Sequence, residues 1–314
     1  MNFQSFAHHG LILSASINAM EPKSRAFRRA VDDGSLVKLR RGAYVDRSEW
    51  ESMSARSKHV LRVRAVIAMA HRDAIVAGFS AAALWGMPVA REWPIDVTIL
   101  DAWLGGGRSE PGVRRTAAGF RDASWVNLGG LKVTTVARTA LDVARGQLLT
   151  DAIGSVDWAR WRRNEHAVSI EELIAEVHKV PPRNGRAHLS RVVGFSTSLS
   201  DSFGESECRG VMAQLGFEPP VLQAPFRDAE GEMRPDYYWP RVRIAGEFDG
   251  FVKYSRTEFT KGDPSAVVWR EKKREDRLRR CGAGVVRILT SDVKNPSRLE
   301  SLLTDAGVPR VGGR

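Results

Sequence analysis

The chain has 314 residues, 43% of them hydrophobic, which is enough for two or three domains with hydrophobic cores. The 48 Lys and Arg against 37 Asp and Glu give a formal net charge of +11, which favours an anionic polymer as partner. No apolar run is long enough to span a bilayer and the N-terminal residues do not read as a secretion signal, so we expect a cytoplasmic protein without a membrane partner. Two cysteines, Cys208 and Cys281, make neither a disulfide framework nor a zinc cluster.

Residues 1–50 predict a small basic domain that binds DNA. In chain order we expect a helix over 3–9, a helix over 23–33 closed by Gly34, and two strands at 36–39 and 43–45 turned at 41–42. A helix followed by a small basic hairpin is the outline of a winged helix-turn-helix. The basic side chains expected to meet DNA are Arg25, Arg28, Arg29, Lys38, Arg40 and Arg41. The alternative is an ordinary solvated helix face.

Residues 51–180 predict an α/β middle domain with no catalytic constellation of its own. A helix of small residues precedes Gly86, residues 95–100 alternate like a strand, and residues 130–144 run from a strand into a helix with Thr135 as N-cap. The glycine triplet at 105–107 lacks the following Lys-Ser/Thr of a phosphate-binding loop, so we interpret it as a flexible loop.

Two phrases, FSAAALWGMP at 79–88 and GLKVTTVARTALDVA at 130–144, resemble AbiEi-type antitoxins. The resemblance implies a winged helix at the N-terminus and a DNA-binding regulator with a cognate toxin as a further partner. After this region, clusters of Pro, Gly and Ser predict a linker over residues 181–200.

The third part, residues 201–314, begins with a predicted helix whose apolar stripe ends before Gly216. Glu205 lies on the buried side of this helix, three residues after Ser202. Ser202 and Glu205 have the spacing of a capping box, which is a purely structural task for the glutamate. A role for Glu205 in a catalytic site is the alternative.

Residues 242–249 have the period of a strand. Val242, Ile244 and Phe248 point to one side, and the other side carries Arg243, Ala245, Glu247 and Asp249. A turn near Pro240 would bring Asp236 beside Glu247. Converging carboxylate oxygens are what a hard divalent cation requires, so this segment predicts a metal site. Asp249-Gly250 is also a common turn dipeptide, which needs no metal.

A strongly basic helix follows around residues 270–280. Arg274 shares a helical stripe with apolar neighbours, a position where charged residues seldom lie without a partner. We expect Arg274 and Arg277 to contact nucleic acid and Lys272 to reach the carboxylates if the helix packs on their strand. The alternative is a basic surface face that only follows the nucleic-acid backbone.

Four stretches together resemble the PD-(D/E)XK nuclease superfamily, and within it the branch related to very-short-patch-repair endonucleases. They are Pro235-Asp236, Glu247-Phe248-Asp249-Gly250, the basic helix 271–279 and the strand 285–289. The resemblance implies a restriction-endonuclease-like mixed sheet flanked by helices. It also implies Mg²⁺ or Mn²⁺ held by Asp236, Glu247 and the main-chain carbonyl of Phe248, with Glu205 completing the site.

This sequence departs from the superfamily pattern at one position. Asp249 stands where the pattern has a lysine, so Lys253 or Lys272 would have to provide the catalytic cation. The leading hypothesis is therefore a multidomain α/β protein that hydrolyses double-stranded DNA with a metal ion. The resemblances place such a protein in bacterial defence or mobile-element biology. The alternative hypothesis is an antitoxin-type transcriptional regulator whose nuclease domain has lost catalysis, and either form could be a homo-oligomer.

Overall fold

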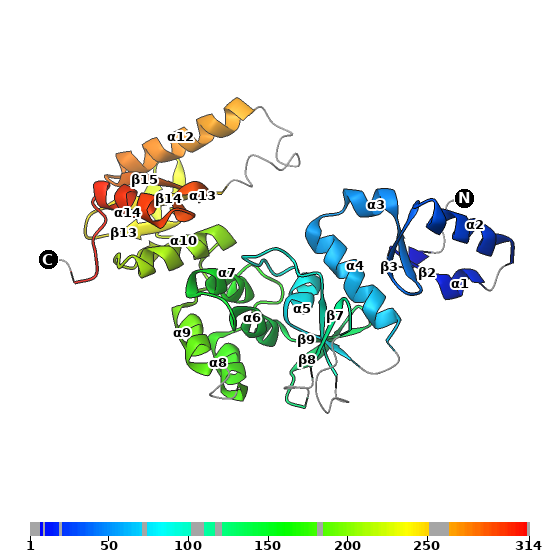
Figure 1. Cartoon of the computed structure of the whole chain (residues 1–314). Coiled ribbons are helices and arrows are strands. Elements are labelled where there is room, and N and C mark those ends of the chain that lie inside the picture. The colour runs from blue at the N-terminus through cyan, green and yellow to red at the C-terminus, as the bar shows by residue number, and fades with distance from the viewer. Residues whose placement is uncertain are drawn as a thin grey trace. The chain divides into compact units, whose positions relative to one another are not determined.

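The computed structural model describes residues 7–8, 10–18, 21–70, 74–101, 110–116, 121–180, 185–250 and 264–312 (Figure 1). The fold is mixed α/β and contains several separate sheets. The chain divides into two compact units. The N-terminal unit comprises Met1–Gly146 and Glu171–Arg186, and the C-terminal unit comprises Gln147–Ile170 and Ala187–Arg314. Within the described residues, no helix is both long and apolar enough to cross a membrane.

The N-terminal unit begins with a four-stranded antiparallel sheet of order β1-β2-β4-β3 and two helices that pack on it. The elements are β1 (Ala7–His8), β2 (Leu11–Leu13), α1 (Ser14–Asn18), α2 (Glu21–Asp32), β3 (Leu36–Arg40) and β4 (Ala43–Asp46). The helix and the hairpin expected from the sequence are both present. The helix expected over 3–9 is wrong at Ala7–His8, which form a strand because the chain reverses at Gly10, at a φ of +78°, and pairs His8 with Leu11.

The rest of this unit is a five-stranded sheet of order β7-β6-β5-β9-β8 with helices beside it. Its elements are α3 (Arg47–Ser52), α4 (Ala55–Ala68), β5 (Ile75–Val76), α5 (Gly78–Trp85), β6 (Val97–Leu100), β7 (Val113–Thr116), β8 (Trp125–Leu128), β9 (Leu131–Thr134), α6 (Val136–Ala144) and α8 (Ile170–Lys179). Thr135 caps α6 as expected, since its hydroxyl accepts from the Arg138 N–H at 3.4 Å. The glycine triplet at 105–107 lies outside the described residues.

The C-terminal unit contains a second mixed sheet of order β10-β13-β14-β15 and a separate hairpin, β11-β12. Its elements are α7 (Leu149–Arg160), α9 (Arg186–Phe195), α10 (Phe203–Gln214), β10 (Val221–Leu222), β11 (Phe226–Asp228), β12 (Gly231–Met233), β13 (Tyr237–Trp239), β14 (Ile244–Asp249), α12 (Pro264–Arg280), β15 (Gly284–Leu289), α13 (Thr290–Val293) and α14 (Pro296–Asp305). Strands β13 and β14 are antiparallel, whereas β14 and β15 are parallel and α12 lies between them in the chain.

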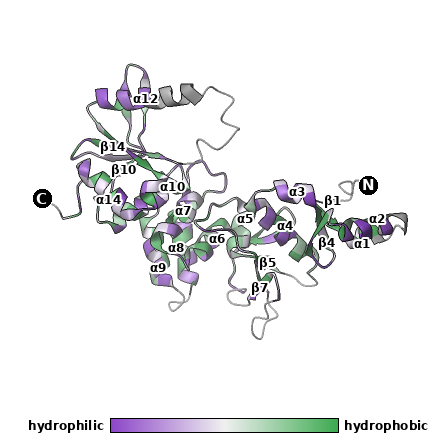
Figure 2. Ribbon diagram, turned by 45° about the horizontal axis from the view of Figure 1, so that its top comes forward, coloured by the Kyte–Doolittle hydropathy of each residue, from purple (hydrophilic) through white to green (hydrophobic). Residues whose placement is uncertain are grey.

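Helices cover both faces of this second sheet. One face carries Ile244 and Phe248 of β14, which share the main core with residues of α10 and α14. The other face carries Ala245, which packs with Leu278 of α12. Figure 2 shows the described part of α12 as mostly hydrophilic, as expected for a helix that buries only a narrow stripe. The side chains of β14 therefore alternate between two covered faces.

The boundary between the units differs from the linear division predicted from the sequence. Helix α7 packs extensively on α10, so residues 147–170 belong with the C-terminal unit. A methyl group on Gly154 would collide with the Phe203 ring, which shows how closely the two helices approach. Helix α9 occupies much of the segment expected to be a linker. Sequence spacing alone cannot detect that a distant helix completes a core.

We predict that Gly204→Ala destabilises the C-terminal unit, although Ala favours helices over Gly. A Cβ at Gly204 would lie 2.6 Å from Cζ of Phe248, so α10 or the ring must move, at a cost of about 1–3 kcal/mol. Urea denaturation followed by circular dichroism measures the change. Gly194→Ala in α9 is the matched control, because a Cβ there meets no atom within 4 Å. Equal effects of the two substitutions would contradict the packing argument.

Candidate functional site

Asp236 and Glu247 lie side by side at one end of the β13–β14 pair. Tyr237 pairs with Gly246, so the next position outward sets Asp236 against Glu247. Oδ2 of Asp236 accepts a hydrogen bond from the backbone N–H of Phe248 at 2.8 Å, which fixes its carboxylate beside β14. This is the arrangement that a turn near Pro240 predicts.

Glu247 and Asp249 share one face of β14, and both are half-buried. The expected alternation holds from Ile244 onward. The strand predicted over residues 242–249 is too long at its N-terminal end, because Val242 and Arg243 precede β14. Val242 is 37% exposed, and Arg243 has a φ of +55°, outside the strand region.

Glu205 lies in the first turn of α10 and is buried. Ser202 caps the helix, since its Oγ accepts from the Glu205 N–H at 3.1 Å. The expected capping box is only half formed, because Oε2 of Glu205 accepts from the N–H of Asp201, at 2.9 Å, where a box would use Ser202. Burial raises the pKa of Glu205 to about 7, and the negative charge of Asp236 adds to the increase. Glu205 is therefore near enough to Asp236 for the charge of Asp236 to affect its ionisation.

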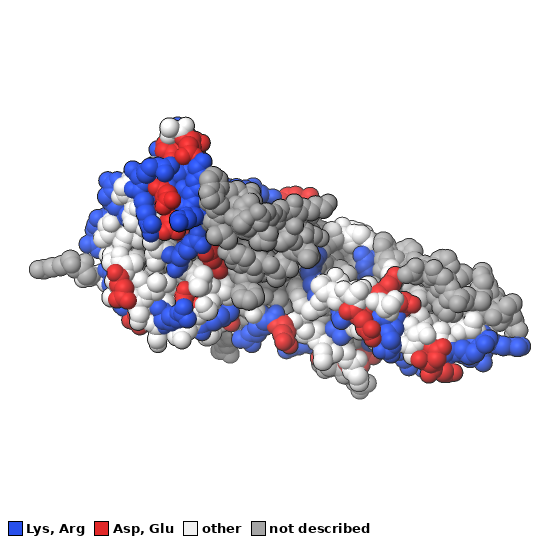
Figure 3. All heavy atoms as spheres, turned by 90° about the horizontal axis from the view of Figure 1, so that it is seen from above, with Lys and Arg blue, Asp and Glu red and all other residues white. Residues whose placement is uncertain are grey.

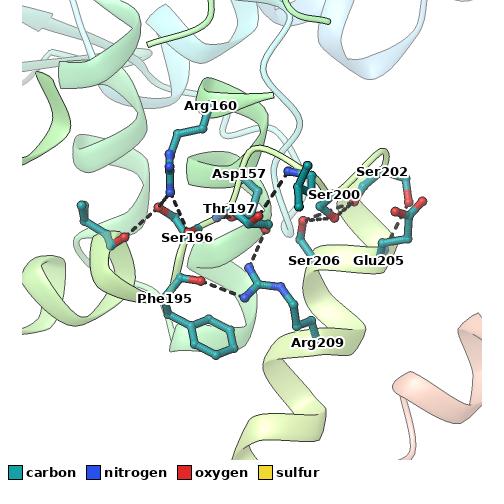
Figure 4. A network of polar contacts seen from close by, with 12 residues as sticks. Asp157, Arg160, Phe195, Ser196, Thr197, Ser200, Ser202, Glu205, Ser206 and Arg209 are labelled. Atoms are coloured by element: carbon teal, nitrogen blue, oxygen red, sulfur yellow. Dashed lines mark hydrogen bonds and ion pairs between the residues drawn. The ribbon is translucent and has the colours of Figure 1, made fainter. Parts of the chain in front are cut away.

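A buried polar network holds the segment that leads into α10 (Figure 4). Asp157 of α7 accepts from Arg209 of α10 at 2.8 Å and from the backbone N–H of Thr197 at 2.7 Å. Arg209 also donates to the carbonyl of Phe195 at 2.8 Å. These groups were not predicted as functional, and nothing in their sequence spacing indicates that they meet. They fix the start of α10, and with it the position of Glu205.

Two arginines contact the carboxylates of β14. Arg274 of α12 donates to Glu247 at 3.0 Å, and Arg287 of β15 donates to Asp249 at 2.9 Å. Arg287 is the register partner of Glu247 on the parallel strand, so its side chain lies on the same face. Arg274 was expected to contact nucleic acid, whereas Arg287 was not singled out. The only signal for Arg287 was a charged residue inside an apolar strand.

The basic side chains of α12 are divided between internal contacts and solvent. Arg277 donates to Asp228 of the β11–β12 hairpin at 2.8 Å, which lowers the pKa of that carboxyl to about 2. An internal partner thus occupies the guanidinium that was expected to contact nucleic acid. Lys272 is exposed, and Lys253 lies outside the described residues. Figure 3 shows Lys and Arg gathered over α12, with acidic groups among them.

In the N-terminal unit the basic side chains of α2 point outward as predicted. Phe27 and Ala30 are buried in the core, whereas Arg25, Arg28 and Arg29 are exposed. Lys38 and Arg41 of the hairpin region are also exposed. Arg40 differs, because it forms an ion pair with Glu110 at 2.8 Å.

The residues at the site partly fit a divalent cation. Asp236 and Glu247 would provide carboxylate oxygens and Phe248 a main-chain carbonyl, a donor set that suits Mg²⁺ or Mn²⁺. Burial raises the pKa of Glu205, and the negative charge of Asp236 adds to the increase, so a cation near these two groups would be attracted. In the described part of the chain, however, no group of three His, Cys, Asp or Glu side chains is already arranged to hold a metal ion. A cation would have to draw these carboxylates together.

Comparison with known proteins gives relatives without an assigned activity. No family model matches the chain. It is 29% identical over 272 residues to the uncharacterized proteins Rv2248 and MT2308 from two strains of Mycobacterium tuberculosis, covering 86% of this chain and 91% of theirs. A crystal structure of RV2827C protein from Mycobacterium tuberculosis has a TM-score of 0.34 and 16% identity over 66% of this chain and 78% of that chain.

We predict that Glu205→Gln stabilises the protein in a pH-dependent way. The folded-state pKa is raised from 4.5 to about 7, so the folded state binds more protons than the unfolded state in that interval. Wild-type stability therefore falls as the pH rises from 4.5 to 7, and the variant escapes this loss. The gain of the variant over wild type should grow by about 3 kcal/mol between pH 4.5 and pH 8, measured by denaturant unfolding at each pH. A constant difference would show that Glu205 does not titrate in this range.

Proposed function

We propose that this protein is a metal-dependent nuclease that hydrolyses phosphodiester bonds of double-stranded DNA. The observation that carries the proposal is that Asp236 lies beside Glu247, close to a buried Glu205. Burial raises the pKa of Glu205, and the charge of Asp236 adds to the increase. Carboxylate oxygens at one place could hold a divalent cation, and such a cation could polarise a phosphodiester and activate water. The formal charge of +11 on the whole chain suits a nucleic acid.

The order of elements in the C-terminal unit supports the resemblance to PD-(D/E)XK nucleases. Helix α10 carries Glu205, the antiparallel pair β13–β14 carries the two site carboxylates, and α12 leads to the parallel strand β15. The N-terminal unit would hold the duplex through the exposed arginines of α2, in the manner of a winged helix. The proposal thus includes a PD-(D/E)XK-like domain in the C-terminal unit and a winged helix in the N-terminal unit.

Each side chain would have a separate role in such a reaction. Asp236, Glu247 and the carbonyl of Phe248 would hold Mg²⁺ or Mn²⁺, which would activate water and polarise the phosphoryl oxygen. Glu205, with a pKa near the working pH, could accept a proton from the attacking water. Arg287 would replace the missing lysine, since it already neutralises Asp249, the residue at that position.

We predict that purified protein cuts duplex DNA with Mg²⁺ or Mn²⁺, and that EDTA, Asp236→Asn or Glu247→Gln abolishes cutting. Each substitution removes a charge from the cation site with little change of size. Gel analysis of plasmid and linear DNA measures the rate. The matched control is Glu218→Gln, which removes a charge near Trp239, toward the opposite end of β13. Full activity in either site variant would remove Asp236 or Glu247 from the site.

A second prediction concerns which basic side chain contributes most to catalysis. Arg287→Gln should lower kcat on the order of a hundredfold while DNA affinity stays nearly intact, because its charge acts mainly on the transition state. Lys272→Ala should have a smaller effect, since Lys272 is exposed and the arginines are the groups in contact with the carboxylates. Lys253→Ala tests the earlier expectation directly. If it alone removes activity, Lys253 rather than Arg287 is the catalytic cation.

The second candidate function is a DNA-binding regulator of antitoxin type. The observation that favours it is that both carboxylates of β14 already have arginine partners. A nuclease fold in that state could serve as a DNA-binding surface in addition to the basic N-terminal unit. Tight, salt-sensitive binding of duplex DNA together with no cutting under any divalent metal would identify the regulator.

A further inference from the structure

We propose that Arg162 and Arg163, in the segment that follows α7, form a binding site for nucleic-acid backbone phosphates beside the carboxylate site. This inference rests on the proposed function, because it deepens the same site. The two residues lie in the C-terminal unit, in a stretch that the sequence assigned to the middle domain. They therefore add a basic surface where none was expected.

The backbone of this segment is held firmly against the chain that leads into α10. The N–H of Arg162 donates to the carbonyl of Ser198 at 3.4 Å, and the indole N–H of Trp161 donates to Asp201 at 2.9 Å. Arg160 donates to both the carbonyl and the hydroxyl of Ser196, at 2.6 and 2.8 Å (Figure 4). A fixed backbone lowers the entropy lost when the neighbouring side chains bind a ligand.

The arginine side chains themselves stay open to solvent. Their guanidinium groups lie 3.9 Å (Arg162) and 3.8 Å (Arg163) from the two carboxylate oxygens of Asp201, and they are 36% and 62% exposed. Contacts of this length at this exposure hold a charge loosely. Two cations on one carboxylate leave one positive charge in excess, so an incoming anion is attracted and finds free N–H donors.

Hydrogen bonds connect this surface to the carboxylate site. The N–H of Asp201 donates to Oε2 of Glu205 at 2.9 Å, and the hydroxyl of Tyr237, the residue after Asp236, donates to the carbonyl of Glu205 at 2.8 Å. Successive phosphates on one DNA strand are separated by only about 3.4 Å along the axis. We expect a strand that places one phosphate at Asp236 and Glu247 to carry its neighbouring phosphates toward the two arginines that flank Asp201.

The competing explanation is that both arginines serve only to neutralise Asp201. The two explanations differ in what a charge-preserving change does. Lysine keeps the charge and the attraction to phosphate, so Arg162→Lys with Arg163→Lys should retain most binding. Glutamine removes the charge and the phosphate contact together.

The test measures binding of a duplex oligonucleotide by the full chain in EDTA, so that cleavage does not interfere. Arg25, Arg28 and Arg29 are replaced by Gln in every protein compared, which weakens binding by the N-terminal unit. Adding Arg162→Gln and Arg163→Gln should flatten the slope of log affinity against log salt by about one to two units and lower affinity roughly tenfold or more near 0.1 M salt. The double Lys variant should stay close to the parent.

Arg241→Gln is the surface control, because this exposed arginine pairs with Glu218 elsewhere in the same unit. An unchanged slope and affinity in the double Gln variant, with an unchanged melting temperature, would overturn the proposal. A slope that falls equally in the Lys and Gln variants would also overturn it. The result can be separated from the test of the nuclease. If the wild-type chain never cuts DNA but the double Gln variant loses binding, the phosphate site is supported without the nuclease. If the double Gln variant cuts DNA with unaltered binding and KM, the phosphate site is refuted and the nuclease proposal stands.

Discussion

A buried ion pair between Asp157 and Arg209 joins α7 to α10 in the C-terminal unit. Asp157 is almost completely buried, and burial raises the pKa of its carboxyl despite the attraction of Arg209. Such a pair contributes little compared with an apolar replacement, but loss of one partner leaves a buried charge and costs about 3–5 kcal/mol. The pair also orders the chain before α10 through Thr197 and Phe195. The place of Glu205 therefore follows from a contact between two helices that are distant in sequence.

The local features of this unit could be predicted from the sequence because they depend on neighbouring residues. The period of β14, the Ser202 cap and the setting of Asp236 beside Glu247 all follow from alternation, cap chemistry and a short turn. The half-formed capping box was beyond such reasoning, because the choice of Asp201 over Ser202 depends on how the preceding segment is held. The contact of Arg287 with Asp249 could not be predicted either, because it depends on the parallel register of β14 and β15, two strands that α12 joins.

The boundaries of the two compact units differ from those predicted from the sequence for a related physical reason. Composition locates stretches rich in Pro, Gly and Ser, and such stretches usually form linkers. Here Ser196 and Ser200 donate to the backbone carbonyls of Val193 and Ser202, and Ser206 of α10 donates to Ser200 and to the carbonyl of Ser202. Their hydroxyls satisfy backbone groups that a buried segment must not leave unpaired. A serine-rich linker and a serine-rich packed segment have the same composition, and only the hydrogen-bond partners of the serines distinguish them.

The arginine partners of Glu247 and Asp249 weigh less against a metal site than their short distances suggest. The Arg274 side chain is 44% exposed, and ion pairs of such exposure contribute about 1 kcal/mol or less. Burial, together with repulsion by Asp236, raises the pKa of Glu205, and a cation beside Glu205 would oppose both effects. A divalent ion that draws Asp236, Glu247 and Glu205 together would relieve that repulsion and release Arg274 toward a phosphate. In the proposed nuclease this exchange would replace a half-exposed ion pair by contacts to a doubly charged ion, so the pairing of Glu247 with Arg274 does not by itself argue against the proposal.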